Sequence, residues 1–176
     1  MNINFLLCLC GIIVNAAGIA FNVYALNTVG AIVLLIGCIR MEFPNTPLGK
    51  KIFHYAIANV IGSTGALFLF LFLNGSHNRM VSSIALGINV FFFIYFTYYF
   101  TEFIIDRAKQ MNESAITRNF RSIWTMAGVL SFVYFMSYYN LTTSVVTIIA
   151  IIFLGAALYY CYATSNIGSV VFSAQQ

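Results

Sequence analysis

The sequence predicts an all-α integral membrane protein, a bundle of six transmembrane helices arranged in three hairpins with both termini in the cytoplasm. Its 176 residues are 61% hydrophobic and only 7% charged, whereas a soluble domain usually carries roughly 25% charged residues. The charges are also confined, because residues 1–39 and 122–176 contain none. A single span needs only about 20 apolar residues, so uncharged runs of this length are expected to cross the bilayer more than once.

The first uncharged run, residues 4–40, is too long for one span and is expected to fold back on itself. The polar residues from Asn22 to Thr28 offer the turn, which predicts helices at about 4–22 and 25–40. The second of these helices is short. The alternative is therefore five spans, if residues 4–40 cross the membrane once instead of forming a hairpin.

Turn signals divide the rest of the chain. Thr46 followed by Pro47 is typical of an N-cap and the first residue of a helix. Polar clusters at residues 74–78, 111–114 and 140–143 mark later breaks. These signals predict four more helices, at about 48–73, at about 80–109, from the break after residue 111 to about 139, and at about 143–164.

Basic residues indicate which side of the membrane faces the cytoplasm. In the six-span arrangement seven of the eight Lys and Arg residues lie on one side and only Arg79 lies on the other. Positively charged loops stay on the cytoplasmic side, so both termini are expected in the cytoplasm. The predicted spans make residues 1–164 one transmembrane domain and residues 165–176 a short cytoplasmic tail. If the cell is bacterial, the expected location is the inner membrane. The seven topology-setting residues are Arg40, Lys50, Lys51, Arg107, Lys109, Arg118 and Arg121.

Small and polar residues recur on one face of the first and third predicted helices. Small residues four apart let membrane helices approach closely, and amides hydrogen-bond between them. One interpretation is therefore helix packing through Gly11, Gly18, Ala58, Gly62 and Ala66. The alternative is a polar pocket near the middle of the membrane, lined by Asn15, Asn59 and Asn89.

A second stripe lies on the fourth predicted helix. Tyr95, Tyr98, Tyr99 and Glu102 share one face, because residues three, four and seven apart are neighbours on a helix surface. Tyrosine rings beside a carboxylate can hold an organic cation. The alternative is an aromatic belt at the membrane interface, with Glu102 paired to Arg107 or Arg121.

The sequence offers little for catalysis. Charged groups inside a bilayer are costly and usually mark function, and the predicted spans have almost none. No C-x-x-C pair or metal-ligand spacing is present, and no span contains a central histidine for haem. We therefore expect no catalytic residue, no metal, no cofactor and no enzymatic activity. The net charge of +4 reflects topology rather than nucleic-acid binding.

Two functions fit these expectations. The first is an accessory or assembly subunit that acts through partner membrane proteins or as a homo-oligomer. The alternative is a small carrier, channel or substrate-capturing subunit that binds a neutral, aromatic or cationic ligand between helices. The two halves would have opposite orientations, as inverted repeats have, although their residues do not match.

Overall fold

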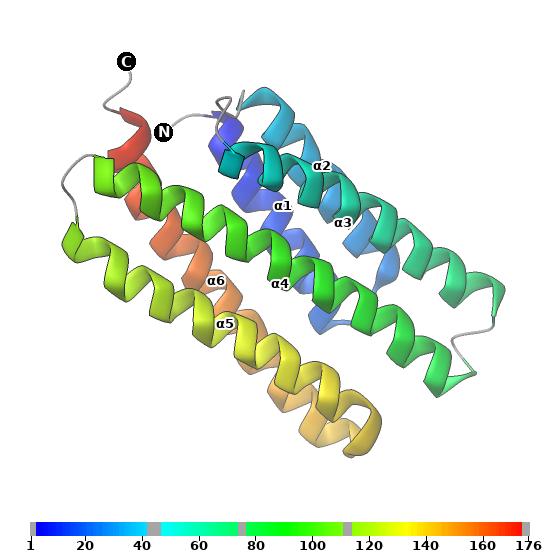
Figure 1. Cartoon of the computed structure of the whole chain (residues 1–176). Helices are drawn as coiled ribbons and strands as arrows, with labels where there is room; N and C mark the ends of the chain where they lie inside the picture. The colour runs from blue at the N-terminus through cyan, green and yellow to red at the C-terminus, as the bar shows by residue number, and fades with distance from the viewer. Residues whose placement is uncertain (1–2, 42–46, 74–76, 111–113, 174–176) are drawn as a thin grey trace.

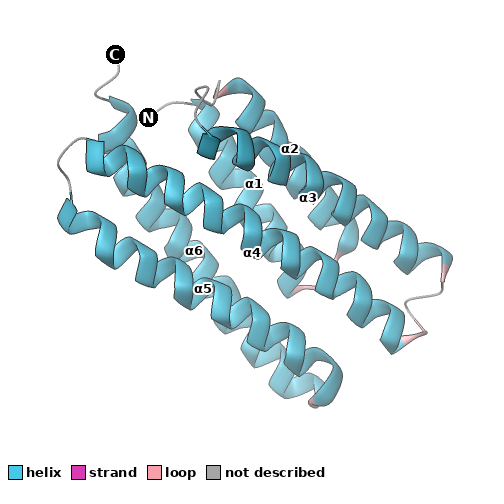
Figure 2. Ribbon diagram, viewed as in Figure 1, coloured by secondary structure: helices cyan, strands magenta, loops and turns pink. Residues whose placement is uncertain are grey.

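The computed structural model describes residues 3–41, 47–73, 77–110 and 114–173. In this part of the chain, helices joined by short turns make up the whole structure (Figure 2). The six helices are α1 (Ile3–Ala20), α2 (Tyr24–Arg40), α3 (Pro47–Phe72), α4 (Arg79–Gln110), α5 (Ser114–Asn140) and α6 (Thr143–Ser173).

The helices form a closed ring in chain order. Each one packs against the next, α6 returns to α1, and α4 also touches α1 and α6 across the ring. The result is two rows of three, with α3, α4 and α5 in one row and α2, α1 and α6 in the other (Figure 1). The beginning of α1 and the end of α6 lie at the same end of the bundle, which we call the termini end. The opposite end, with the α1–α2 and α5–α6 turns, is the turn end.

This ring does not have the geometry of an inverted repeat. A two-fold axis in the membrane plane reverses the sense in which three successive helices follow one another around a bundle. Here α1–α3 and α4–α6 follow one another in the same sense, because the ring closes in chain order. The two halves therefore have opposite directions only because successive helices run antiparallel, and each helix of the first half comes three helices before its counterpart.

Four of the helices, α1, α3, α4 and α6, are long and apolar enough to cross a membrane, which indicates an integral membrane protein. α2 is apolar but has only 17 residues. α5 begins with a polar stretch that includes Asn119 and Arg121. Around the ring, α2 lies between α1 and α3, and α5 lies between α4 and α6, whereas the long apolar helices α3 and α4 are direct neighbours.

The α1–α2 hairpin expected in residues 4–40 is present, and glycines determine how its helices meet. Gly11 faces Leu34, Gly18 faces Asn27, Gly30 faces Asn15 and Gly37 faces Cys8, so the numbers of facing residues always add up to 45. Within each helix the two glycines are seven residues apart. Every glycine therefore receives a larger residue of the other helix, and the two backbones come close together.

The last helix is longer than expected. α6 continues to Ser173, so the predicted end at residue 164 is wrong and most of the expected tail is helical. Ile167 and Gly168 are buried, and Gly168 lies against the ring of Phe5 in α1. Packing against α1 therefore overrides the local polar residues Ser165 and Asn166, because tertiary contacts supply most helical stability. Residues 174–176 lie outside the described part of the chain.

Candidate functional site

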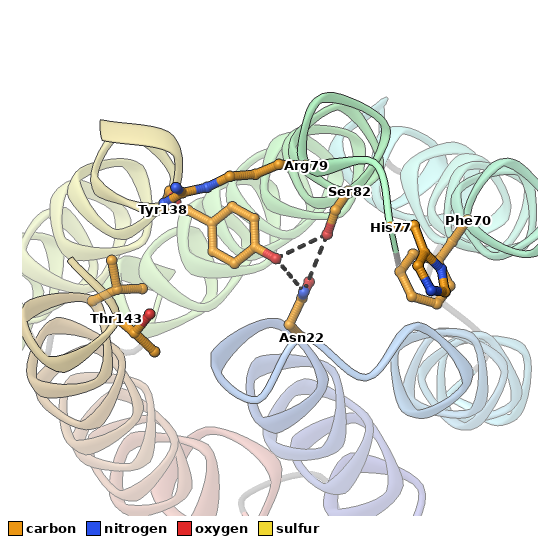
Figure 3. A pocket seen from close by; sticks show the side chains of 8 residues that line it. Asn22, Phe70, His77, Arg79, Ser82, Tyr138 and Thr143 are labelled. Atoms are coloured by element: carbon orange, nitrogen blue, oxygen red, sulfur yellow. Dashed lines mark hydrogen bonds between the residues drawn. The ribbon is translucent and has the colours of Figure 1, made fainter. Parts of the chain in front are cut away.

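The candidate site lies at the turn end, and the α1–α2 turn builds its first part. Asn22 has a φ of 56°, a left-handed conformation that asparagine tolerates better than most residues. The Asn22 N–H donates to the Ile19 carbonyl (3.2 Å) and the Val23 N–H donates to the Gly18 carbonyl (2.8 Å). These two bonds are those of a Schellman motif. The motif ends α1 and directs the Asn22 side chain toward α4 and α5 (Figure 3).

Asn22 joins a cluster of hydroxyl groups from three other helices. Its Nδ2 donates to the Tyr138 hydroxyl (2.7 Å) and, more weakly, to Ser82 Oγ (3.3 Å). The Ser82 and Tyr138 hydroxyls are 2.9 Å apart. Tyr24 completes the cluster by donating to the Ser82 carbonyl (2.8 Å). The cluster therefore joins the α1–α2 turn to α4 and α5.

Arg79 supplies the positive charge at this end. Its Nη2 donates to the carbonyl oxygens of Tyr138 (2.9 Å) and Leu141 (3.2 Å), where α5 ends. The guanidinium carbon also lies 5.9 Å from the centre of the Tyr139 ring. Free carbonyls at a helix C-terminus attract cations, so α5 holds this arginine at the rim of the site.

These groups surround a pocket of about 430 Å³. Figure 3 shows its lining as seen down the bundle, with Asn22, Ser82 and Tyr138 joined by hydrogen bonds. Asn22 Oδ1 is buried and has no hydrogen-bond partner among the described residues. Whichever way the amide is turned, one of its two polar atoms binds the hydroxyls and the other is left to a ligand or water. The lining residues are Asn22, Phe70, His77, Arg79, Ser82, Tyr138, Thr143 and Val146.

An apolar pocket of about 300 Å³ adjoins the first one. The two share four lining residues, Asn22, Tyr138, Thr143 and Val146. The second pocket runs along α6 past Ala150 to Leu154 and is otherwise lined by the end of α1 and by Tyr134. We call this second pocket the apolar arm. Together the two offer one polar end and one apolar end, and pockets of this combined size are typical of small-molecule sites.

Comparison with protein families, with curated proteins and with solved structures finds no match to this chain. The function is therefore inferred from the chemistry of the site itself.

The asparagines expected to line a pocket lie elsewhere. Asn15, Asn59 and Asn89 are all buried, but none of them lines the pocket or its apolar arm. Asn89 Nδ2 donates to the Ala85 carbonyl (3.1 Å). Neither amide atom of Asn15 or Asn59 has a partner among the described residues. They are polar groups inside the α1–α4 part of the bundle, apart from the site at the turn end.

The residues expected to pack helices have different surroundings. Gly11 and Gly18 lie in the α1–α2 interface described above. Gly62 lies against the ring of Phe92 in α4. Ala66 is buried and Ala58 is half-buried.

The tyrosine stripe is already supplied with cations by the protein. The Lys51 ammonium lies 5.6 Å from the centre of the Tyr99 ring, and Tyr55 stacks on Tyr99 and Tyr95 with ring centres 4.7 and 5.7 Å apart. Two bonds of 2.8 Å join Arg121 Nη2 to both carboxylate oxygens of Glu102. The expected pairing of Glu102 with an arginine is thus confirmed, with Arg121 as the partner.

The topology-setting residues occupy the termini end. Arg40 ends α2, Lys50 and Lys51 begin α3, and Arg107 and Lys109 end α4. Arg121 lies in the first half of α5. Arg118 belongs to the same helix, but its side chain lies outside the described part of the structure. Arg79 begins α4 at the turn end, apart from the other described basic residues.

Sequence reasoning missed the Asn22, Ser82 and Tyr138 cluster. Asn22 carries a local signal, because an asparagine just after a helix is typical of a left-handed C-terminal cap. Its partner Tyr138 is 116 residues away, and only the ring closure brings the two together.

Proposed function

We propose that the protein is a non-enzymatic polytopic membrane protein that captures a small amphiphile with a neutral or anionic polar group at the turn end. The observation that carries this proposal is the continuity between the polar pocket and the apolar arm, which share Asn22, Tyr138, Thr143 and Val146. A molecule with one polar and one apolar end matches both parts at once.

The proposed topology has six spans with both termini cytoplasmic. Its support is the antiparallel packing of α2 along α1 and of α5 along α6, together with the basic residues gathered at the termini end. At 1.5 Å per residue, the 17 residues of α2 extend roughly 25 Å, close to the thickness of the hydrocarbon core. In this topology the pocket opens on the side away from the cytoplasm.

The charge of the site favours neutral and anionic ligands over cationic ones. Arg79 lines the pocket, and its positive charge repels an ammonium group and attracts a carboxylate or phosphate. The unpaired amide atom of Asn22 adds one neutral hydrogen-bonding position. The cationic ligand that the tyrosine stripe suggested has less support, because Lys51 and Arg121 already lie against that stripe.

The apolar arm suggests how such a ligand arrives. Phe21 and Ile151 line it and are each 63% exposed. In a membrane, exposed apolar side chains at this position face lipid. An amphiphile can therefore enter sideways from the bilayer, with its tail along α6 and its polar group beside Asn22 and Arg79.

The test is ligand binding to the full chain in lipid nanodiscs, followed by native mass spectrometry. The probes are oleate, monoolein and an alkyltrimethylammonium of equal chain length. We expect oleate and monoolein to bind at one per chain and the cationic probe to bind at least about 10-fold more weakly. Tyr138→Phe removes one hydroxyl and should weaken binding up to about 10-fold, since a hydrogen bond contributes about 0.5–1.5 kcal/mol.

Matched variants separate the pocket from general effects. Tyr139→Phe makes the same change one residue along, outside the lining of the pocket, and should leave binding unchanged. Ala150→Leu fills the apolar arm and should weaken binding. Gly155→Leu lies on the same helix, where nothing lies within 4 Å of an added Cβ, and should leave binding unchanged. Equal binding by all four variants and the wild type would show that the probes bind elsewhere and would overturn the proposal.

A second candidate is the accessory subunit, because one groove suits a neighbouring membrane helix. This groove has a volume of about 430 Å³ and is lined by apolar residues of α4 and α5 around Gly87, Phe91 and Phe132. The ring of Phe135 covers Gly87, but Phe91 and Phe132 are exposed, so a neighbouring membrane helix can pack against them.

Copurification distinguishes the two candidates. A stoichiometric protein partner that Phe132→Ala releases would favour the accessory subunit, because Phe132 lines this groove and is exposed. A bound amphiphile that Phe132→Ala leaves in place would favour ligand capture.

A further inference from the structure

Three sulfur atoms from two helices meet at the termini end of the α1–α2 hairpin. Cys8 Sγ lies 3.7 Å from Met41 Sδ, and Cys38, the residue after the Gly37 on which Cys8 packs, lies beside Cys8. Cys8 and Cys38 are fully buried and Met41 is half-buried. Two thiols and a thioether therefore gather around Cys8, which is in contact with Met41.

The packing of the hairpin explains why these sulfurs meet. Gly37 has no side chain, and a methyl group placed there would lie 2.7 Å from Cys8 Sγ. Cys8 can therefore lie directly on α2. Cys38 follows Gly37 in the chain, and Met41 follows Cys38 by three residues, which brings both to the same side of the helix. Met41 is held in place as the C-cap of α2, where its N–H donates to the Gly37 carbonyl (3.0 Å).

Two thiolates and a thioether are soft ligands, which select Cu(I) over the harder divalent ions. Metal–sulfur bonds of about 2.3 Å place the three sulfurs of a trigonal site roughly 4 Å apart, close to the separation of Cys8 and Met41. Among the described residues, no three His, Cys, Asp or Glu side chains gather as a metal site. A zinc or calcium centre therefore has no ligand set here, whereas a site that includes a thioether does.

The cluster also has a route to the surface. Cys38 lines a pocket of about 300 Å³ at the termini end, together with Ile39, Gly49, Lys50, Phe53 and His54. The pocket thus provides an entry path to one of the two thiols.

We propose that Cys8, Cys38 and Met41 bind one Cu(I) ion. On binding, each thiol releases its proton to solvent, and the metal forms bonds to two thiolates and one thioether without any change of oxidation state. The sequence predicts no metal site, because Cys8 and Cys38 are far apart in the chain and only the α1–α2 hairpin brings them together. This site lies at the opposite end of the bundle from the amphiphile pocket and is independent of it.

The test is anaerobic titration of the full chain in detergent with Cu(I), supplied as its bicinchoninate complex. We expect one tightly bound Cu(I) per chain. Cys8→Ser and Cys38→Ser should each lower the affinity at least about 100-fold, and Met41→Leu should lower it about 10-fold, since even outer-shell changes cost 10–100-fold at metal sites. X-ray absorption should show only sulfur neighbours, at about 2.3 Å.

The other two cysteines provide the control. Cys10 is exposed and Cys161 is buried in α6, and neither belongs to the cluster. The double variant Cys10→Ser/Cys161→Ser should bind Cu(I) as the wild type does. This variant still tests the proposal if Cys8→Ser fails to fold. Loss of binding in that double variant, or equal affinity in Cys8→Ser and the wild type, would overturn the proposal.

Discussion

The α1–α2 interface and the α3–α4 interface both contain glycines, but different atoms lie over them. A methyl group added to Gly30 would lie 2.5 Å from the backbone nitrogen of Asn15. A methyl group added to Gly62 would instead meet the ring of Phe92. In the first interface backbone faces backbone, and in the second a side chain fills the space above the glycine.

The difference matters because a side chain can move away from an added methyl group more easily than a helix backbone can. A phenyl ring can rotate about its side-chain bonds, whereas a helix backbone moves only if the whole helix moves. The α1–α2 hairpin is therefore expected to behave as one rigid unit, and α3–α4 as an adaptable one. Four substitutions test this comparison.

The largest effect is expected for Gly30→Ala. The new methyl group forces α1 and α2 apart along their length, and we expect the free energy of unfolding to fall by about 3 kcal/mol. Thermal unfolding in detergent, followed by circular dichroism, measures the change. No single side-chain truncation should restore stability, because the obstacle is the backbone of Asn15. A loss below about 1 kcal/mol would show that the hairpin adapts after all.

A smaller effect is expected for Gly62→Ala, about 1 kcal/mol, because the Phe92 ring can move aside. The double variant Gly62→Ala/Phe92→Leu should recover most of this loss in the same unfolding assay. If the double variant adds the two losses instead, the ring is not what the methyl group meets.

Asn59→Leu should change the free energy of unfolding by less than about 1 kcal/mol. Leucine of similar size costs some packing, but it removes a buried amide that has no partner among the described residues, and such amides are costly in an apolar interior. The same denaturation experiment decides the matter. A loss above about 2 kcal/mol would mean that an ordered water or ligand binds Asn59.

The smallest effect is expected for Gly65→Ala on α3, where nothing lies within 4 Å of the added methyl group. Alanine favours the helix over glycine, so stability should rise by about 0.5 kcal/mol. Gly155→Ala on α6 has the same open surroundings and serves as a replicate. Destabilisation of both variants by 1 kcal/mol or more would point to a packed partner at these faces.

Most of the fold could be predicted from the sequence because charge and turn signals are local. Pro47 begins α3 and Asn140 ends α5, as their residue types indicate. The end of α6 could not be predicted, since Gly168 packs against Phe5, which lies near the other end of the chain. The order of the helices around the ring was equally out of reach, because no local pattern encodes which helices become neighbours.

The candidate sites were harder to predict than the fold. A pocket lined by Asn15, Asn59 and Asn89 was the alternative to helix packing, and none of the three lines the pocket at the turn end. The pocket depends on Asn22, Ser82 and Tyr138, and the sulfur cluster depends on Cys8 and Cys38. In each case the residues come from different helices or turns, and the ring closure or the register of the α1–α2 hairpin brings them together.

That register has a further consequence. Because the glycines of α1 and α2 repeat every seven residues, the hairpin has a second phase in which α2 slides by one heptad, roughly 10 Å. In that phase Asn15 would lie on Gly37 and Leu34 on Gly18, so half of the fitted pairs would survive. The interface alone is therefore degenerate. The turn between the two helices, residues 21–23, selects one of the two registers. It is too short, and too tightly held by its hydrogen bonds, to allow α2 to shift by seven residues.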